Sequence, residues 1–422
     1  MKKFAIITAA IFMSVALIAP AMAVELEVTG GEFRMQGFNM SNGSSTLTDG
    51  AASNAYYDFW LIPEITLTVN DSIKINTRVA IVDENLGGDE TVAKGTTAEW
   101  DRAWATLLTD YGKFDIGRMS GGTFGINTFE TVATRDRIKW TMPVDNFIFL
   151  GVIEKNAELD GTDTTDATSD DNDYDVYYAA GIYKVENIEA GLLVGHAINA
   201  TDPTGTKTFQ VFNPYCNINI NDTYGVKAEV HYLAGEFDAD DDDDDSDISG
   251  LGFFIAGTGN FGQTKVEVGY MYASGDDESD DDSTSLKDAG GGGGYNAGMG
   301  DEWTPFVILQ DANMLLDDLD GDGASDNTYG VNLFYAQADY ALSDDMTLTG
   351  MLGFASASDT PEDYDKSYGT EIDAKLEWRL TDALTYNFNL GYLMAGDFFK
   401  LGDDAAEIED TFTVYHKLQI DF

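Results

Sequence analysis

Apolar and polar residues alternate one by one along much of this chain. Between positions 370 and 379 one set of alternate residues is mainly apolar and ends in Trp378, while the other is fully charged. Successive side chains of a strand point to opposite faces, so this pattern predicts a strand with a lipid-facing stripe and a face turned to a water-filled lumen. The residues expected to face the lumen are Glu371, Asp373, Lys375, Glu377 and Arg379.

The alternation recurs in segments 73–81, 226–232 and 265–272. The candidate strands run about 9 to 15 residues, near the length that a tilted membrane strand requires. Short polar turns and longer segments alternate between them, which predicts about 18 strands in an all-β, transmembrane, antiparallel up-and-down barrel. The alternative is 16 strands, because segments 131–142 and 208–220 are weakly patterned. An even number places both termini on the periplasmic side, with short periplasmic turns and long external loops.

Both ends of the chain agree with an exported barrel. Lys2 and Lys3 precede an apolar stretch, and the small-residue site 21–23 follows, so residues 1–23 are expected to be a signal peptide. Residues 24–422 are then one barrel domain in the cell outer membrane. The last strand alternates as far as the terminal Phe422, which resembles the signal that the outer-membrane assembly machinery recognises.

The charge balance excludes several functions. The chain has 23 basic and 75 acidic residues, and loss of Lys2 and Lys3 leaves 21 basic residues and a net charge of −54. Such a surface repels phosphates, which argues against nucleic-acid binding. The single Cys216 and three histidines offer no zinc or haem framework, and no histidine lies in a recognisable hydrolase motif. We therefore do not expect an enzyme.

Over nearly all of the mature chain the architecture resembles the Gram-negative outer-membrane porins. The segment from 369 to 397 resembles the closing hairpin of delta-proteobacterial and alginate-export-like porins. In porins a loop after an early strand folds inward and narrows the pore. The corresponding segment here follows the strand 113–118, and charged residues flank it. The residues expected to set up a transverse field across the constriction are Arg118, Glu130, Arg135, Asp136, Arg137 and Lys139. The alternative is that they form ordinary salt bridges in the barrel wall.

Two long loops, 236–247 and 274–328, are strongly acidic. Runs of like charge are usually solvated, although weak calcium or magnesium binding at the outer leaflet is an alternative. The second loop contains half of a calcium-binding pattern, in which carboxylates at alternate positions converge on the ion. The candidate calcium ligands are Asp318, Asp320, Asp322 and Asp326. The twelfth position is Tyr329 instead of the glutamate that usually completes such a loop.

The second acidic loop also contains an apolar stretch, 303–309. A loop of this length is usually functional or disordered, and an apolar stretch within it implies packing. We expect the loop to fold into the lumen as a partial plug.

These features predict a porin for passive diffusion of small hydrophilic solutes or ions, with a preference for cations or neutral solutes. The expected surroundings are outer-membrane lipid and lipopolysaccharide, and both a monomer and a homotrimer remain open. Two other functions stay as alternatives: a barrel sleeve for an electron-conduit complex, and an adhesin with acidic metal-binding loops. No room remains ahead of the strands for the plug domain of an energised transporter.

Overall fold

The computed structural model describes most of the chain. The described residues are 25–41, 47, 53–85, 99–129, 133–158, 173–202, 204–239, 245–277, 282–286, 303, 305–311 and 329–422. The expected signal peptide, Glu130 and all four candidate calcium ligands lie outside these ranges.

Nearly all regular structure in the described residues is β-strand, and all strands belong to one sheet. The strands of the first half are β1 (Glu25–Met40), β2 (Asn54–Asn70), β3 (Ile73–Ala80), β4 (Val82–Asn85), β5 (Glu99–Thr109), β6 (Gly112–Ser120), β7 (Thr134–Val144), β8 (Phe147–Ala157) and β9 (Tyr174–Val185). Those of the second half are β10 (Ile188–Asn199), β11 (Gly205–Asn219), β12 (Tyr224–Ala239), β13 (Ser246–Phe261), β14 (Thr264–Ala273), β15 (Val331–Ser343), β16 (Met346–Ser356), β17 (Ser367–Thr381), β18 (Leu384–Ala395) and β19 (Thr411–Asp421). A π-helix, η1 (Val307–Asp311), and a 3-10 helix, η2 (Asp397–Lys400), lie in loops.

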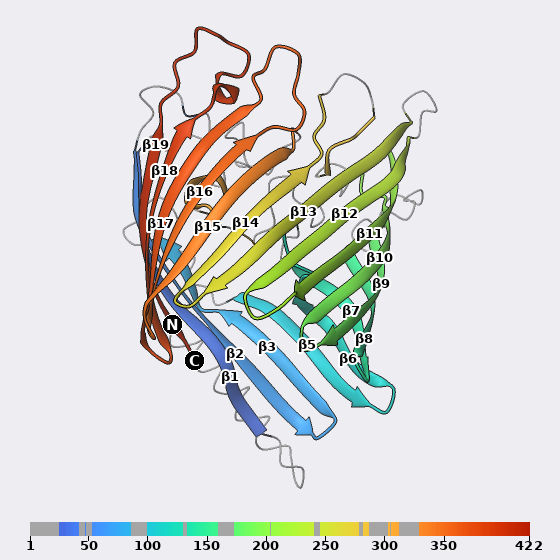
Figure 1. Cartoon of the computed structure of the whole chain (residues 1–422). Coiled ribbons are helices and arrows are strands. Elements are labelled where there is room, and N and C mark those ends of the chain that lie inside the picture. The colour runs from blue at the N-terminus through green and yellow to red at the C-terminus, as the bar shows by residue number, and fades with distance from the viewer. Residues whose placement is uncertain are drawn as a thin grey trace.

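The sheet closes on itself as a barrel (Figure 1). The first strand pairs antiparallel with the last, from Glu32 opposite Asp421 to Met40 opposite Thr413. Strands β3 and β4 are two parts of one strand, because both pair with β2 and the Ile81 peptide nitrogen between them donates to Leu61 at 2.9 Å. The nineteen strand segments of the described chain therefore form 18 barrel strands, which confirms the predicted fold.

The connections alternate between short and long, as the sequence predicts. Short turns join β2 to β3, β5 to β6, β7 to β8, β9 to β10, β11 to β12, β13 to β14, β15 to β16 and β17 to β18. The alternative of 16 strands is wrong, since both weakly patterned segments form strands, β7 and β11. The first strand begins and the last strand ends near the short-turn end, where Glu25 pairs with Thr68 and Ile420 pairs with Leu384.

The outward face of the wall is a band of exposed apolar side chains. Val268, Ile372 and Phe334 are 56%, 49% and 57% exposed, although their strand neighbours on the other face are largely shielded. Aromatic residues collect near the short turns, among them Tyr111, Tyr224 and Trp378. Such a band with an aromatic girdle is the outer surface of a barrel that sits in lipid. No helix in the described residues is long and apolar enough to cross a bilayer.

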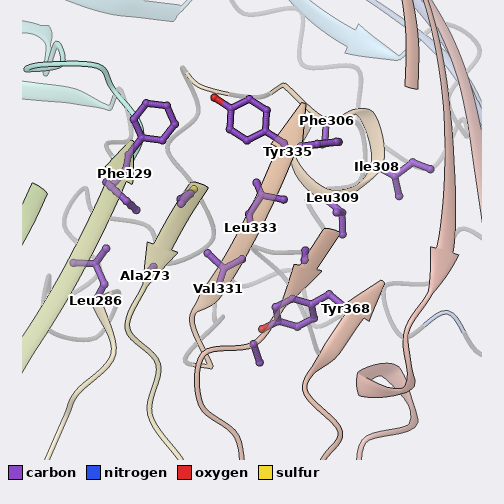
Figure 2. Packing of buried hydrophobic residues seen from close by; sticks show 14 of the residues in the cluster. Phe129, Ala273, Leu286, Phe306, Ile308, Leu309, Val331, Leu333, Tyr335 and Tyr368 are labelled. Carbon is purple, nitrogen blue, oxygen red and sulfur yellow. The ribbon is translucent and has the colours of Figure 1, made fainter. Parts of the chain in front are cut away.

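Buried apolar side chains lie on the inward face, toward the end with the long loops. Figure 2 shows wall residues of β14 and β15, including Ala273, Val331 and Leu333, close to Phe306 and Leu309 from the η1 region. The wall residues and the loop residues belong to one cluster. Part of the interior is therefore a packed core.

Candidate functional site: the inward wall and the loops folded against it

The inward face of β17 carries the charged residues that alternation predicts for the lumen. Glu371 and Asp373 are 0% and 4% exposed, whereas Ile372 between them is 49% exposed on the outward face. Lys375, Glu377 and Arg379 continue the same register toward the short-turn end. Glu371 and Asp373 are covered by η1; the sequence predicted that this apolar stretch folds inward but not that it packs on these two acids.

A chain of hydrogen bonds crosses the inward face of the early strands. Thr66 donates to Asn76 at 3.0 Å, Asn76 donates to Thr106 at 3.0 Å, and Thr106 donates to Asp115 at 2.7 Å. Lys113 forms an ion pair with Asp115 at 2.7 Å. Side chains from β2, β3, β5 and β6 thus make one connected polar wall, as expected for a surface that faces water.

Arginines line the same sector of the inward face. The Arg34 guanidinium lies 3.2 Å from the centre of the Trp60 ring, a cation–π contact. The Nε atoms of Arg78 and Arg102 lie 2.5 Å and 3.8 Å from Asp101. Together with Arg137 on β7, these inward residues of β1, β3, β5 and β7 form a group that we call the arginine arc: Arg34, Arg78, Arg102 and Arg137.

The structure divides the residues predicted for the constriction between the two faces of the wall. Arg135 and Arg137 point inward and pair with Glu154 of β8, Arg135 at 3.4 Å; Glu154 is 3% exposed. Lys139 lies two positions after Arg137 on β7 and pairs with Asp115 of β6, so it is also on the inward face.

Arg118 and Asp136 lie on the outward face, where they form an ion pair at 3.0 Å and their side chains are both 55% exposed. They pair across β6 and β7 in the same register as the outward Ile116 and Ile138. The proposed transverse field therefore cannot include this pair, which is a correction to the sequence interpretation. Glu130 lies outside the described residues.

The loop that follows β6 reaches strand β12. The peptide nitrogens of Ile126 and Thr128 each donate to Glu229 at 3.2 Å, and the Thr128 hydroxyl donates at 2.9 Å. Glu229 is 0% exposed and lies 3.3 Å from the ring of His231, which is also fully buried. The segment 121–129, which we call the first inward loop, is thus anchored to the inward face far from its own strands.

Aromatic contacts complete the seat of the first inward loop. The Phe124 ring meets the Tyr215 ring of β11 edge-on at 5.1 Å, and the Phe129 ring lies 5.2 Å from His231. A Cβ atom at Gly252 of β13 would lie 3.1 Å from Phe129, a tight contact that would require the ring to shift by a few tenths of an ångström. The loop therefore covers the inward face of strands β11 to β13.

Residues 303 and 305–311 form what we call the second inward loop, which lies against strands β13 to β18. Phe306, Val307, Ile308 and Leu309 are all 0% exposed. The ring of Trp303 lies 5.2 Å from that of Phe254 and 5.4 Å from that of Tyr335. The part of loop 274–328 that the structure describes is thus packed on the inward wall.

The alternation in segment 226–232 places Glu229 and His231 on the polar face of their strand, but it does not indicate their contact with the first inward loop. No local pattern signals that contact, because Thr128 and Glu229 are 101 positions apart. The carboxylates near the long-loop end include Glu236, Asp238, Asp245, Asp247 and Asp282, which line one surface cleft. Within the described ranges, no group of three or more acidic, His or Cys side chains is arranged to hold a metal ion.

No protein-family model and no curated protein matches this sequence. Solved structures do match in fold. OpdO of Pseudomonas aeruginosa is 12% identical, with 93% of this chain and 96% of that chain covered and a TM-score of 0.57. The outer membrane protein OpdK of the same organism is 10% identical, with 94% and 98% covered and a TM-score of 0.55. OccAB1 of Acinetobacter baumannii is 11% identical, with 93% and 96% covered and a TM-score of 0.56. The chain thus shares the complete barrel fold of these proteins at very low sequence identity; the delta-proteobacterial and alginate-export-like likeness finds no counterpart among them.

Proposed function

We propose that this protein is an outer-membrane channel through which small hydrophilic solutes or ions diffuse passively. The observation that carries the proposal is a closed 18-strand barrel with an apolar outward band and a polar, charged inward face. A barrel of this size is wide enough to leave an aqueous passage, and loops folded inward would narrow it. The shared fold with the outer membrane protein OpdK supports the same location and the same class of function.

The surroundings follow from this location. The outward band would contact lipid, and the acidic external loops would meet lipopolysaccharide. The terminal Phe422, whose peptide nitrogen donates to Gly31 at 3.0 Å, would be the residue that the assembly machinery reads. A homotrimer would form through the outward face of the wall; cross-linking in membranes tests it.

Cations and neutral solutes are the first candidate class. Without the expected signal peptide the chain has a net charge of −54, and a field of that sign raises the local concentration of cations at the channel mouth. Wall carboxylates such as Asp115 and Glu267 are paired with lysines, so they add little to that field inside the barrel.

Small carboxylates are the second candidate class, and the arginine arc favours them. Guanidinium groups bind carboxylates through two parallel hydrogen bonds. Arg34 stacks on Trp60, while Arg78, Arg102 and Arg137 already pair with wall carboxylates, so a solute carboxylate would have to share or displace these partners. OpdK has been crystallised with vanillate, an aromatic carboxylate.

Electrical recording from the purified protein in planar bilayers tests the proposal. We expect discrete conductance steps, and a membrane that stays silent under all conditions would refute the channel. The reversal potential under a salt gradient then separates the two solute classes: its sign gives cation or anion preference. A sleeve for an electron conduit would instead co-purify with a haem protein, and an adhesin would bind surfaces without conducting.

A further inference from the structure

Two carboxylates of β17 hold the second inward loop against the wall. The Val307 peptide nitrogen donates to Asp373 Oδ2 at 3.0 Å, and those of Ile308 and Leu309 donate to the two oxygens of Glu371 at 2.6 and 2.9 Å. Three consecutive peptide N–H groups therefore end on two acids that are 0% and 4% exposed.

These bonds are made where water cannot replace them. The first peptide N–H groups of a helical turn have no acceptor within the turn, so they need partners from elsewhere. Here the turn is surrounded by Phe306, Tyr335 and other members of the buried cluster (Figure 2). The oxygens of the two acids supply the acceptors that the apolar turn lacks, which makes Glu371 and Asp373 its polar anchor.

The two inward loops contact neighbouring inward positions of β13. A Cβ atom at Gly252 would lie 3.1 Å from Phe129 of the first inward loop and 3.0 Å from Leu286, which belongs to segment 274–328 ahead of the second inward loop. One register position away on the inward face, Phe254 contacts Trp303 of the second inward loop. Glu229 anchors the first inward loop in the same way as Glu371 anchors the second.

We propose that Glu371 and Asp373 are positioning residues for the pore: they fix the second inward loop on the wall and thereby set the aperture through which solutes pass. This inference rests on the proposed channel function. It assigns to two wall acids a task distinct from contact with the solute, since both are covered by the loop that they hold.

The test measures loop position and conduction separately. All variants carry Cys216→Ala, because Cys216 is the only cysteine of the chain. Leu309→Cys then reports loop position through its rate of reaction with a water-soluble maleimide, and single-channel conductance reports the aperture. The variants compared are Glu371→Ala, Glu371→Gln and the double variant Glu371→Ala with Asp373→Ala. The matched control is Asp382→Ala, which removes an exposed carboxylate from the turn of the same hairpin.

We expect the rate of maleimide reaction to rise about tenfold or more in the alanine variants, since buried donors are left without acceptors. Glu371→Gln keeps one acceptor oxygen and should give a smaller rise. Conductance should increase in the same order, and the control should match the parent. Ile308→Pro removes the peptide N–H that donates to Glu371 and leaves the wall residues unchanged, so it tests the anchor even if a wall variant does not fold. Heat-dependent mobility in gels identifies the variants that fold into barrels.

The possible failures are distinguishable. An unchanged rate of labelling in the folded double variant and in Ile308→Pro would refute the anchor. Faster labelling with unchanged conductance would refute its control of the aperture. A parent protein that labels slowly but never conducts would refute the channel function while leaving the anchor intact.

Discussion

Thr128 directs both its peptide nitrogen and its hydroxyl to one carboxylate oxygen of Glu229, at 3.2 and 2.9 Å. The two residues are 101 positions apart in the chain, and both are fully buried. The contact joins a loop that leaves β6 to a strand in the second half of the barrel. It is therefore a long-range bond that fixes how far the first inward loop extends across the lumen.

Graded changes at this contact should have graded effects. Thr128→Val removes only the hydroxyl bond, which should lower the free energy of unfolding by about 1 kcal/mol. Glu229→Ala removes the acceptor of three donors of the first inward loop and of the Asn213 amide, so it should cost roughly 3 kcal/mol or more and give a larger single-channel conductance. Urea unfolding of the membrane-inserted barrel measures the free energy of unfolding. The control is Asp222→Ala, in the exposed turn before β12. If the Thr128 and Glu229 variants lowered the free energy of unfolding equally, the role of Glu229 as the anchor of the first inward loop would be contradicted.

Alternation and the spacing of turns together predicted most of the wall. It assigned the inward and outward residues of segments such as 370–379 and 226–232, and the rhythm of turns gave the number of strands. It could not predict what lies over the inward residues. The bonds to Glu371 and Asp373 come from positions 62 to 66 residues away, so no local period encodes them.

The error over Arg118 has a related cause. Arg118 and Arg137 are on two strands joined by a loop. Alternation shows which residues of one strand share a face, but it does not show which of the two faces of the next strand continues that face across a loop. The pairing of β6 with β7 places Arg118 opposite Asp136, which puts both on the outward face. The charged residues near Arg118 and Arg137 are close in sequence and so suggested one cluster, but the pairing of β6 with β7 places them on opposite faces of the wall.

Calcium binding to Asp318, Asp320, Asp322 and Asp326 remains a prediction, because these residues lie outside the described ranges. We expect a Kd on the order of 10⁻⁴ to 10⁻³ M, the range of extracellular calcium modules. Isothermal titration of the EDTA-treated protein measures it. The double variant Asp320→Asn with Asp322→Asn should abolish the heat of binding, while Asp403→Asn in another external loop should not. Equal heats in all three proteins would exclude the site.

The outward band predicts a strong penalty for charge. Val268 is 56% exposed in the middle of β14, between inward Glu267 and Gly269. Val268→Arg should therefore lower the free energy of unfolding in a bilayer by roughly 2 to 4 kcal/mol if the site is near the midplane. Val268→Leu keeps the apolar contact with lipid and should change it little. Urea unfolding in vesicles compares them, and equal stability of the Arg and Leu variants would show that this face is not in lipid.

The ion preference of the channel should depend on Arg137 and be independent of Arg118. Arg137 points inward and pairs with Glu154, whose remaining basic partner is Arg135 at 3.4 Å. Arg137→Ala removes one positive charge from the inward wall and leaves Glu154 less compensated, so the ratio of cation to anion permeability should rise. Because the Arg137 side chain is 7% exposed and paired with Glu154, the rise should stay below the roughly fivefold change that an unpaired charge about 4 Å from a monovalent ion in water would give.

Arg118→Ala is the matched control, because it removes the same charge from the same hairpin but from the outward face. Reversal potentials under a salt gradient give the permeability ratio for both variants and the parent. A shift with Arg137→Ala alone would mean that the inward arginines influence selectivity despite the acidic loops. If neither variant shifts the ratio, the acidic mouth dominates, and the cation or neutral-solute preference predicted from the net charge is favoured over passage of carboxylates. A shift with Arg118→Ala alone would contradict the assignment of the two faces, since an outward charge is separated from the lumen by the wall itself.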